Sequence, residues 1–310
     1  MGGLDNFSVV PDALLLKYER RGHVTTRQLL PGKAVDTLRI EANKAVDTRE
    51  LEALRQRVRV LCPSVDPQGI KSAEAAFQIL ADHGDDEVGF LQFFNLHRHS
   101  EAVRAIVTSP RLVATASQIL GGVSKLRVYQ DCLFLKKPGF GATNWHSDLR
   151  MAPLDTHKLV TAWIPLRDVS GEGDSGLIFA QGSHRDFALP FWYDLSAEPF
   201  DLASRGYPLG SVGRMAVGDV SWHDGWVLHA APPQPPRSPV RAALAVSYFC
   251  DGAPTLARDH PAFRGDRGHA EDAESYAAWI DDVPHGAPAR HELLPLVHAP
   301  PLSQAATRRR

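Results

Sequence analysis

Residues 126–136 read Leu-Arg-Val-Tyr-Gln-Asp-Cys-Leu-Phe-Leu-Lys, and they open the part of the chain that decides the fold. The run is rich in β-branched, aromatic and other apolar residues that suit a strand. Similar short runs follow between turns that contain Gly, Pro or Asp, at 159–166, 177–180, 214–217, 227–228 and 242–249. Short strands at this spacing predict an antiparallel sandwich or barrel.

The chain before this region is helical in character. Helices are predicted at 14–20, 33–62, 72–83 and 101–120, and in the last of these the apolar residues recur near one face at a helical period. No linker separates the halves. We therefore predict one α+β, mainly β, domain over residues 1–310, with N-terminal helices (11–122) that buttress a β core (123–250) and an irregular C-terminal extension (251–310).

Composition excludes several classes of protein. The 310 residues are 44% hydrophobic and 23% charged, with a formal net charge of -2, which is typical of globular proteins and implies no nucleic-acid partner. The apolar runs are too short to cross a bilayer, and no signal segment opens the chain, so no membrane association is expected. Cys62, Cys132 and Cys250 show no CxxC spacing and fit the cytoplasm or another reducing compartment. Nothing in the sequence indicates an oligomeric state.

Two segments carry side chains that suit a metal. Residues 144–148, Asn-Trp-His-Ser-Asp, place His146 and Asp148 two apart, so that on an extended segment both point to the same side and Trp145 points away. Residues 218–229 end at His229. Two histidines and one carboxylate on one face of an octahedral metal form the site of non-haem Fe(II) oxygenases. The His-x-Asp triplet alone is weak evidence in a chain with 14 histidines.

A third element strengthens this hypothesis. Arg241 opens the run 241–249, and a guanidinium can grip the far carboxylate of a keto acid with two hydrogen bonds. If the run is a strand, Arg241, Ala243, Ala245 and Ser247 share one face. The small side chains beside the arginine would leave a pocket open.

The order of these motifs resembles the phytanoyl-CoA dioxygenase family, from about Tyr18 to Tyr248 and more faintly to Leu294. The resemblance includes Lys-Lys-Pro-Gly at 136–139, the His-x-Asp triplet, Thr-Ala-Trp at 161–163, Gln-Gly-Ser-His-Arg at 181–185, Gly-Asp at 218–219 and His-Asp-Gly-Trp at 223–226. It implies a double-stranded β-helix, a jelly-roll or cupin-like barrel of eight strands. It also implies cofactors Fe(II), 2-oxoglutarate and O2, with the site residues His146, Asp148, His229 and Arg241.

The resemblance assigns further positions around the cosubstrate. It implies that Cys132 and Trp163 lie beside 2-oxoglutarate, whereas Ala231 replaces a serine that contacts the cosubstrate in some relatives. Relatives that are halogenases carry Gly or Ala in place of the carboxylate ligand, so Asp148 predicts no halogenase activity. The family pattern places the metal on His229 and not on His223, which is expected to line the site or to bond to the backbone.

Other side chains receive weaker assignments. Gln130 and Phe134 share a predicted strand face with Cys132, and we expect them, with His223, on the substrate side. His184 is expected to cap its turn, and His97, His99 and His157 are interpreted as surface residues. The aromatic stretch 187–207 is a long insertion that either forms a lid over the barrel mouth or packs onto the barrel.

The implied reaction is hydroxylation of a C–H bond in a small, apolar organic substrate, with release of succinate and CO2. Desaturation, epoxidation and ring formation begin with the same hydrogen abstraction, and the sequence does not separate them. The alternative from another class is a non-catalytic or isomerase-type metal-binding β-barrel. A structural metal site is normally filled by protein ligands, which makes Arg241 and an open coordination sphere arguments against it.

Overall fold

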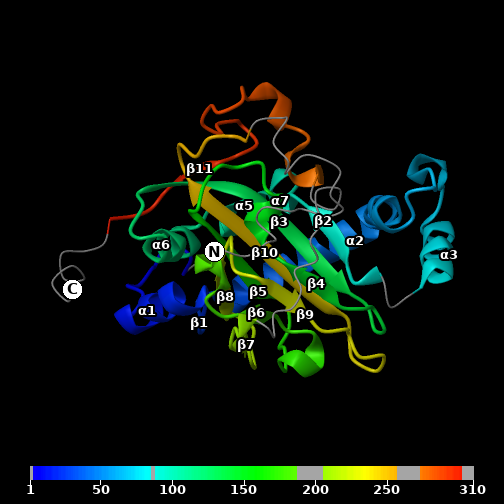
Figure 1. Cartoon of the computed structure of the whole chain (residues 1–310), viewed down its shortest axis with the longest axis horizontal. Coiled ribbons are helices and arrows are strands. Elements are labelled where there is room, and N and C mark those ends of the chain that lie inside the picture. Colours follow the sequence, from blue (N-terminus) through cyan, green and yellow to red (C-terminus); the bar gives the residue numbers. More distant parts are fainter. Residues whose placement is uncertain (1–2, 85–87, 187–204, 257–272, 302–310) are drawn as a thin grey trace.

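The computed structural model describes residues 3–84, 88–186, 205–256 and 273–301. Most of the aromatic insertion, residues 187–204, lies outside these ranges, as do residues 257–272 of the C-terminal extension. Helices and strands are labelled in Figure 1. The α-helices are α1 (Asp12–Arg21), α2 (Gly32–Leu61), α3 (Ala73–His83), α5 (Glu101–Val107), α6 (Pro110–Ile119) and α7 (Asp148–Met151), and the 3-10 turns are η1 (Pro67–Gly69), η2 (Leu96–Arg98), η3 (Glu172–Asp174), η4 (Ser183–Arg185) and η7 (Ile280–Asp282).

The strands form two antiparallel sheets. The larger has seven strands in the order β1 (His23–Thr26), β8 (Val220–Asp224), β5 (Leu159–Pro165), β10 (Arg241–Cys250), β3 (Lys125–Lys136) and β11 (Leu296–His298), with β2 (Leu91–Phe94) also paired to β3. The smaller has four, in the order β4 (Thr143–His146), β9 (His229–Ala231), β6 (Ile178–Ala180) and β7 (Leu209–Ser211). The site described below lies where the two sheets face each other.

Alternation along β10 gives the larger sheet two different faces. Ala243 and Ala245 pack against Trp163 and against Phe179 of the smaller sheet, so this is the inner face. The intervening Leu244, Val246 and Tyr248 belong to the core on the outer side. The strand periodicity predicted from the run 241–249 is therefore present in the structure.

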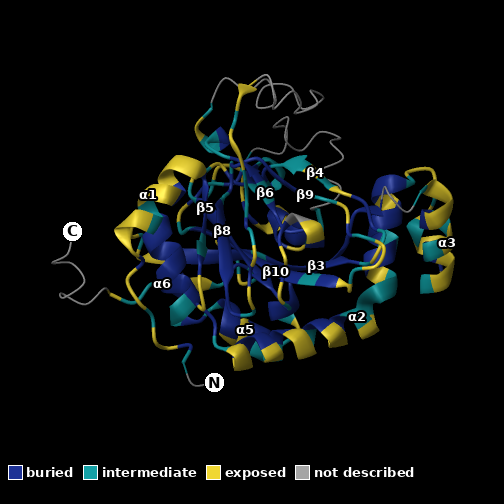
Figure 2. Ribbon diagram, turned by 90° about the horizontal axis from the view of Figure 1, so that it is seen from below, coloured by how far each residue is buried: buried dark blue, intermediate teal, exposed yellow. Residues whose placement is uncertain are grey.

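Helices cover the outer face. Buried residues of α2, including Val35, Leu54 and Val58, share one hydrophobic core with Leu133 of β3 and Leu244 of β10. Figure 2 shows α2 running beneath β3 and β10 with its exposed residues turned outward. The N-terminal helices thus buttress the sheet, as predicted.

Three predicted elements differ from the structure. The predicted helix 101–120 is two helices, because Pro110 occupies the first turn of α6 and Ser109 caps that helix by accepting a hydrogen bond from Leu112 N–H at 3.5 Å. The predicted strand 214–217 is absent: Met215 makes only an isolated bridge, and the chain turns so that Asp219 accepts from Ala216 N–H at 2.9 Å. The predicted strand 227–228 is wrong as well, since residues 224–227 form a turn and β9 begins at His229.

Two predicted histidine environments are settled by the packing. His97 is not a surface residue: its side chain is 1% exposed and its Nδ1 bonds to the carboxylate of Asp131, which is itself buried on β3. The sequence around His97 is polar, and only the fold places η2 against β3. His184 does not cap its own turn: its Nε2 donates to the Glu19 carbonyl of α1 at 3.1 Å and so joins η4 to that helix.

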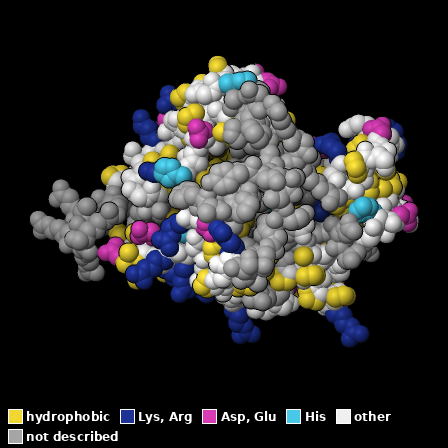
Figure 3. Space-filling view, in the orientation of Figure 1, with side chains coloured by type: hydrophobic (Ala, Val, Ile, Leu, Met, Phe, Trp, Pro, Cys, Tyr) yellow, Lys and Arg dark blue, Asp and Glu magenta, His cyan; other side chains and the backbone are white. Residues whose placement is uncertain are grey.

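The surface has mixed charge. On the face shown in Figure 3, lysine and arginine side chains are interspersed with aspartate and glutamate. Within the described ranges, no helix is both long and apolar enough to cross a membrane.

Candidate metal centre

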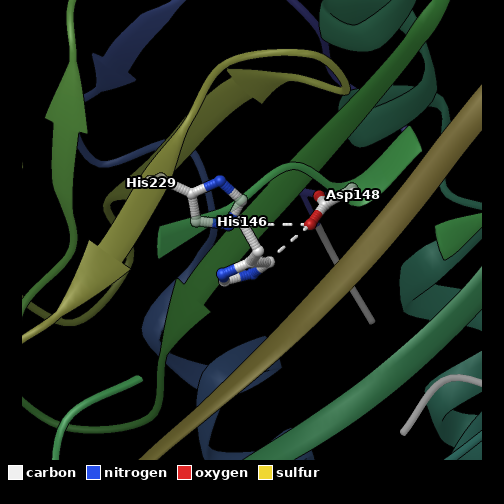
Figure 4. Close-up of side chains that lie close together, drawn as sticks. All are labelled: His146, Asp148 and His229. Carbon is white, nitrogen blue, oxygen red and sulfur yellow. Dashed lines mark ion pairs between the residues drawn. The ribbon is translucent and has the colours of Figure 1, made fainter. Parts of the chain in front are cut away.

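Three predicted ligands converge on one point. His146, Asp148 and His229 each offer one ligand atom, and these atoms lie within 4.8 Å of one another. Figure 4 shows the three side chains pointing toward a common centre. The two histidines stand directly opposite each other on β4 and β9, and their ring centroids are 4.1 Å apart.

The backbone brings Asp148 to this point in a way that the sequence did not predict. Strand β4 ends at His146, the backbone of Ser147 is still extended, and Asp148 is the first residue of the short helix α7. Leu149 is buried and donates its N–H to the Gly225 carbonyl at 2.8 Å. A Cβ at Gly225 would lie 2.6 Å from the Leu149 side chain, so the close approach requires glycine there. This contact holds the start of α7 against the turn after β8, so the chain is extended through Ser147 and becomes helical at Asp148.

Backbone carbonyls set the orientation of both histidine rings. His146 Nδ1 lies 2.7 Å from the Asn144 carbonyl, and His229 Nδ1 lies 3.1 Å from the Val227 carbonyl. Because a carbonyl only accepts, each Nδ1 carries the hydrogen and donates it. The Nε2 atoms therefore keep free lone pairs, and they lie 3.9 Å (His146) and 3.6 Å (His229) from Asp148 Oδ1. This tautomer is the one that binds a metal through Nε2.

The two oxygens of Asp148 have different surroundings. Oδ1 faces the histidines, whereas Oδ2 accepts from Thr161 Oγ1 at 2.6 Å and from His223 Nε2 at 3.1 Å. Burial alone would raise the pKa of Asp148, but its electrostatic interaction with His229 and the hydrogen bond from His223 outweigh it and hold the pKa well below its usual range. Asp148 is therefore ionised at neutral pH.

Burial has the opposite consequence for His229. It lowers the pKa of His229 well below its ordinary value, and the nearby His146 and His223 lower it further. A neutral imidazole beside an ionised carboxylate is the protonation state that binds a divalent cation. The donor set therefore fits Fe(II) held by three protein ligands with further positions open.

Arg241 lies on the same inner face, and its environment fits an anionic ligand. It is 3% exposed, its Cζ lies 5.5 Å from the centroid of the Trp163 ring, and its Nε has no hydrogen-bond partner in the described part of the chain. Burial lowers its pKa to about 10, and the charge of Arg167 contributes. The neighbouring carboxylate of Asp174 is already paired with Arg167. A buried guanidinium of this kind needs an anion, and a carboxylate of 2-oxoglutarate would supply it.

The remaining predicted residues line the same face. Trp163 lies beside Arg241, Cys132 stands opposite Ala245, and Phe134 stands opposite Ala243. Gln130 stands opposite Ser247, and its Oε1 is buried without a partner in the described residues. His223 borders the site as expected, but it bonds to a carboxylate and not to the backbone.

Sequence reasoning missed three polar residues of this region. Thr161 was noted only as part of a motif, and Ser247 only as a small residue, although Thr161 Oγ1 and Ser247 Oγ lie 3.0 Å apart next to Asp148. Thr161 lies two residues before Trp163, and Ser247 lies two residues after Ala245. On a strand this spacing places both residues on the inner face, and it is the signal that could have identified them. Lys136 is fully buried beside Arg241 and donates to the carbonyls of Gly141 (2.6 Å) and Pro232 (3.1 Å). Lysines are seldom buried, so no pattern indicated this one.

Comparisons with known proteins agree with this geometry. The family model described as phytanoyl-CoA dioxygenase matches residues 18–238. No curated protein matches the sequence at a significant level.

Solved structures with a similar fold include several 2-oxoglutarate-dependent enzymes. The non-heme carbocyclase SnoK from nogalamycin biosynthesis is 22% identical, with 93% of this chain and 96% of that chain covered and a TM-score of 0.66. The epimerase SnoN from the same biosynthesis is 19% identical, with 94% and 98% covered and a TM-score of 0.64. EctD from S. alaskensis, solved with 2-oxoglutarate and 5-hydroxyectoine, is 16% identical, with 86% and 90% covered and a TM-score of 0.57.

These likenesses confirm the predicted double-stranded β-helix. The family match covers well over half of the chain, and the chain is an enzyme that uses Fe(II), 2-oxoglutarate and O2. The chain belongs to the phytanoyl-CoA dioxygenase family of Fe(II)- and 2-oxoglutarate-dependent oxygenases.

Proposed function

We propose that the protein hydroxylates a C–H bond of a small organic substrate, with release of succinate and CO2. In this proposal His146, Asp148 and His229 hold Fe(II), and Arg241 binds the distal carboxylate of 2-oxoglutarate. The observation that carries it is the convergence of two Nε2 atoms and one carboxylate oxygen between the two sheets, near a buried guanidinium whose Nε has no hydrogen-bond partner among the described residues. When bound, the metal and cosubstrate supply, with O2, the oxidant that removes hydrogen from the substrate.

The protein's own residues bind, orient and exclude water. Arg241 directs the cosubstrate along the inner face, where the side chains of Ala243 and Ala245 beside it on β10 are small. Trp163 on this face and Phe179 on the facing smaller sheet are buried and keep the region between the sheets apolar. We assign Cys132 to the cosubstrate pocket and Gln130 and Phe134 to the substrate side, since each has its strand partner on β10.

Hydroxylation is the direct outcome of hydrogen removal followed by oxygen transfer. Asp148 occupies the position that a halide would need, so we propose no halogenation. The carbocyclase and epimerase among the similar structures show that this fold also supports other outcomes in those proteins. Desaturation, epoxidation and ring formation therefore stay alternatives, and the mass of the product separates hydroxylation, which adds one oxygen atom, from desaturation and ring closure.

A non-catalytic or isomerase-type metal-binding barrel is the remaining alternative. It would not require a buried guanidinium near the site, whereas binding the distal carboxylate of a keto acid requires a cation there.

The first experiment measures succinate formed from 2-oxoglutarate by anaerobically reconstituted protein with Fe(II) and ascorbate, after exposure to air. We expect uncoupled turnover in the wild type and its loss in His146→Ala and Asp148→Ala. His99→Ala, which changes an exposed histidine, is the matched control and should retain turnover. Retention of turnover in both ligand variants would refute the assigned centre.

A further inference from the structure

A row of polar side chains crosses the inner face of the seven-stranded sheet beneath the candidate metal centre. Gln130 of β3 stands opposite Ser247 of β10, Ser247 opposite Thr161 of β5, Thr161 opposite His223 of β8, and His223 opposite His23 of β1. The three central residues are each at most 4% exposed. Buried polar groups are costly unless they are hydrogen-bonded, so the bonds they make indicate what the row does.

The directions of the hydrogen bonds follow from donor counting. Thr161 donates its one hydroxyl hydrogen to Asp148 Oδ2 at 2.6 Å. Ser247 must then be the donor in its 3.0 Å contact with Thr161. His223 likewise carries its hydrogen on Nε2, and its buried Nδ1 has no partner among the described residues. Thr161 and His223 therefore both donate to Oδ2 of Asp148, and Ser247 donates to Thr161 Oγ1.

We propose that Thr161 and His223, supported by Ser247, are positioning residues that hold Asp148 Oδ2 and leave only Oδ1 for the metal. Both donors stand on neighbouring strands of the larger sheet, which makes their positions rigid relative to each other. A carboxylate that binds through one oxygen occupies one coordination position, so the remaining positions stay open for 2-oxoglutarate and O2. The proposal rests on the function proposed above, because it assumes that Asp148 is a metal ligand.

The chain offers a matched control on the same strand as His223. Ser221 lies two residues away, faces the same side and stands opposite Trp163. It is 0% exposed, but its Oγ has no hydrogen-bond partner among the described residues and does not reach Asp148. Ser221→Ala therefore removes a buried hydroxyl from this face without removing a bond to the ligand.

The test is titration of metal-free protein with Mn(II), without cosubstrate, in which free Mn(II) is followed by electron paramagnetic resonance. Loss of a partner that orients a metal ligand typically weakens metal binding by about 10–100-fold. We expect at least about tenfold weaker binding in Thr161→Val and His223→Phe, and a smaller loss in Ser247→Ala, which acts through Thr161. Thr161→Ser and His223→Gln keep a donor and should bind more tightly than Thr161→Val and His223→Phe. Ser221→Ala should match the wild type.

Circular dichroism establishes that each variant is folded. Wild-type Mn(II) affinity in folded Thr161→Val would overturn the proposal, and so would equal losses in Thr161→Val and Thr161→Ser, which would indicate packing. If Thr161→Val does not fold, the comparison of His223→Phe with His223→Gln decides by the same criterion. Asp148→Ala distinguishes failure of the positioning proposal from failure of the proposed function. Unchanged Mn(II) binding in that variant refutes the proposed function itself.

Discussion

Arg241 is predicted to determine the affinity for 2-oxoglutarate. Its guanidinium is buried, and charge-assisted hydrogen bonds contribute about 1.5–3 kcal/mol each. Arg241→Met keeps much of the side-chain volume but removes the charge, so we expect the Kd for 2-oxoglutarate to rise by about 100-fold. Calorimetry on Mn(II)-loaded protein without O2 measures this Kd. The Kd for Mn(II) itself should not change, and an unchanged Kd for 2-oxoglutarate would contradict the assignment.

Lys136 makes stability depend on pH. Burial, with the charges of Arg241 and Arg57, lowers the pKa of Lys136 to about 6. Between about pH 6 and pH 10 the unfolded chain holds a proton on this amine that the folded chain does not, so raising the pH stabilises the folded state.

We compare the free energies of unfolding of the wild type and of Lys136→Met. The difference, wild type minus variant, should rise by up to about 1.4 kcal/mol per pH unit across this range. Urea unfolding of both proteins at pH 6.5, 7.5 and 8.5 measures the difference. A difference that does not vary with pH would show that Lys136 stays protonated in the folded protein.

The ligand residues could be predicted because their motifs have fixed spacing along the chain. His146, Asp148, His229 and Arg241 were all chosen in this way, and the structure brings the first three together. The partners of Asp148 could not be predicted in the same way. Thr161 and His223 become neighbours only through the register of β5 with β8, and register depends on the whole sheet.

At the scale of single elements, η2 is joined to the outer face of β3 by one side chain. Asp131 accepts the N–H groups of Leu96 (2.8 Å) and His97 (3.1 Å) as well as the bond from His97 Nδ1. Asp131→Ala leaves these buried donors without partners, so we expect a loss of about 3 kcal/mol in the free energy of unfolding. Urea denaturation measures the loss. Asp36→Ala, at a carboxylate that is 61% exposed, is the control and should change stability by less than about 0.5 kcal/mol.

Of the strands that were not predicted, which also include β7 and β8, three share a property. β1, β2 and β11 have three or four residues each, too few for an alternating pattern, and all three lie in segments predicted as helical or irregular. They are strands because β8 and β3 offer them open edges. The strands β3, β5 and β10 could be predicted because each has enough residues for its apolar character to be visible.

For the whole molecule, the core that joins α2 to the larger sheet predicts cooperative unfolding. Leu54 of α2 is 0% exposed within that core, and Leu→Ala changes at such sites cost about 2–5 kcal/mol. We expect Leu54→Ala to move the urea-unfolding transitions recorded by far-ultraviolet circular dichroism and by tryptophan fluorescence to lower urea by the same amount. Ile40→Ala changes a residue of the same helix that is 56% exposed. It should change the free energy of unfolding obtained from either signal by less than about 0.5 kcal/mol.

Separate transitions for the two signals would contradict the prediction of a single domain. The fold class was predictable because the change from helical to strand periodicity near residue 123 is sharp. The contribution of the C-terminal extension was not, since β11 is defined only by its pairing with β3.

The two sheets meet the proposed metal from opposite sides. His146 and His229 stand on the four-stranded sheet, whereas Asp148 is hydrogen-bonded to β5 and β8 of the seven-stranded sheet. A bound cation would therefore tie one sheet to the other, and its removal would let them separate and close again. Backbone amides of β4 and β9 should then exchange their hydrogens with deuterium faster in the metal-free protein, while those of β10, paired on both sides, should exchange at the same rate in either state.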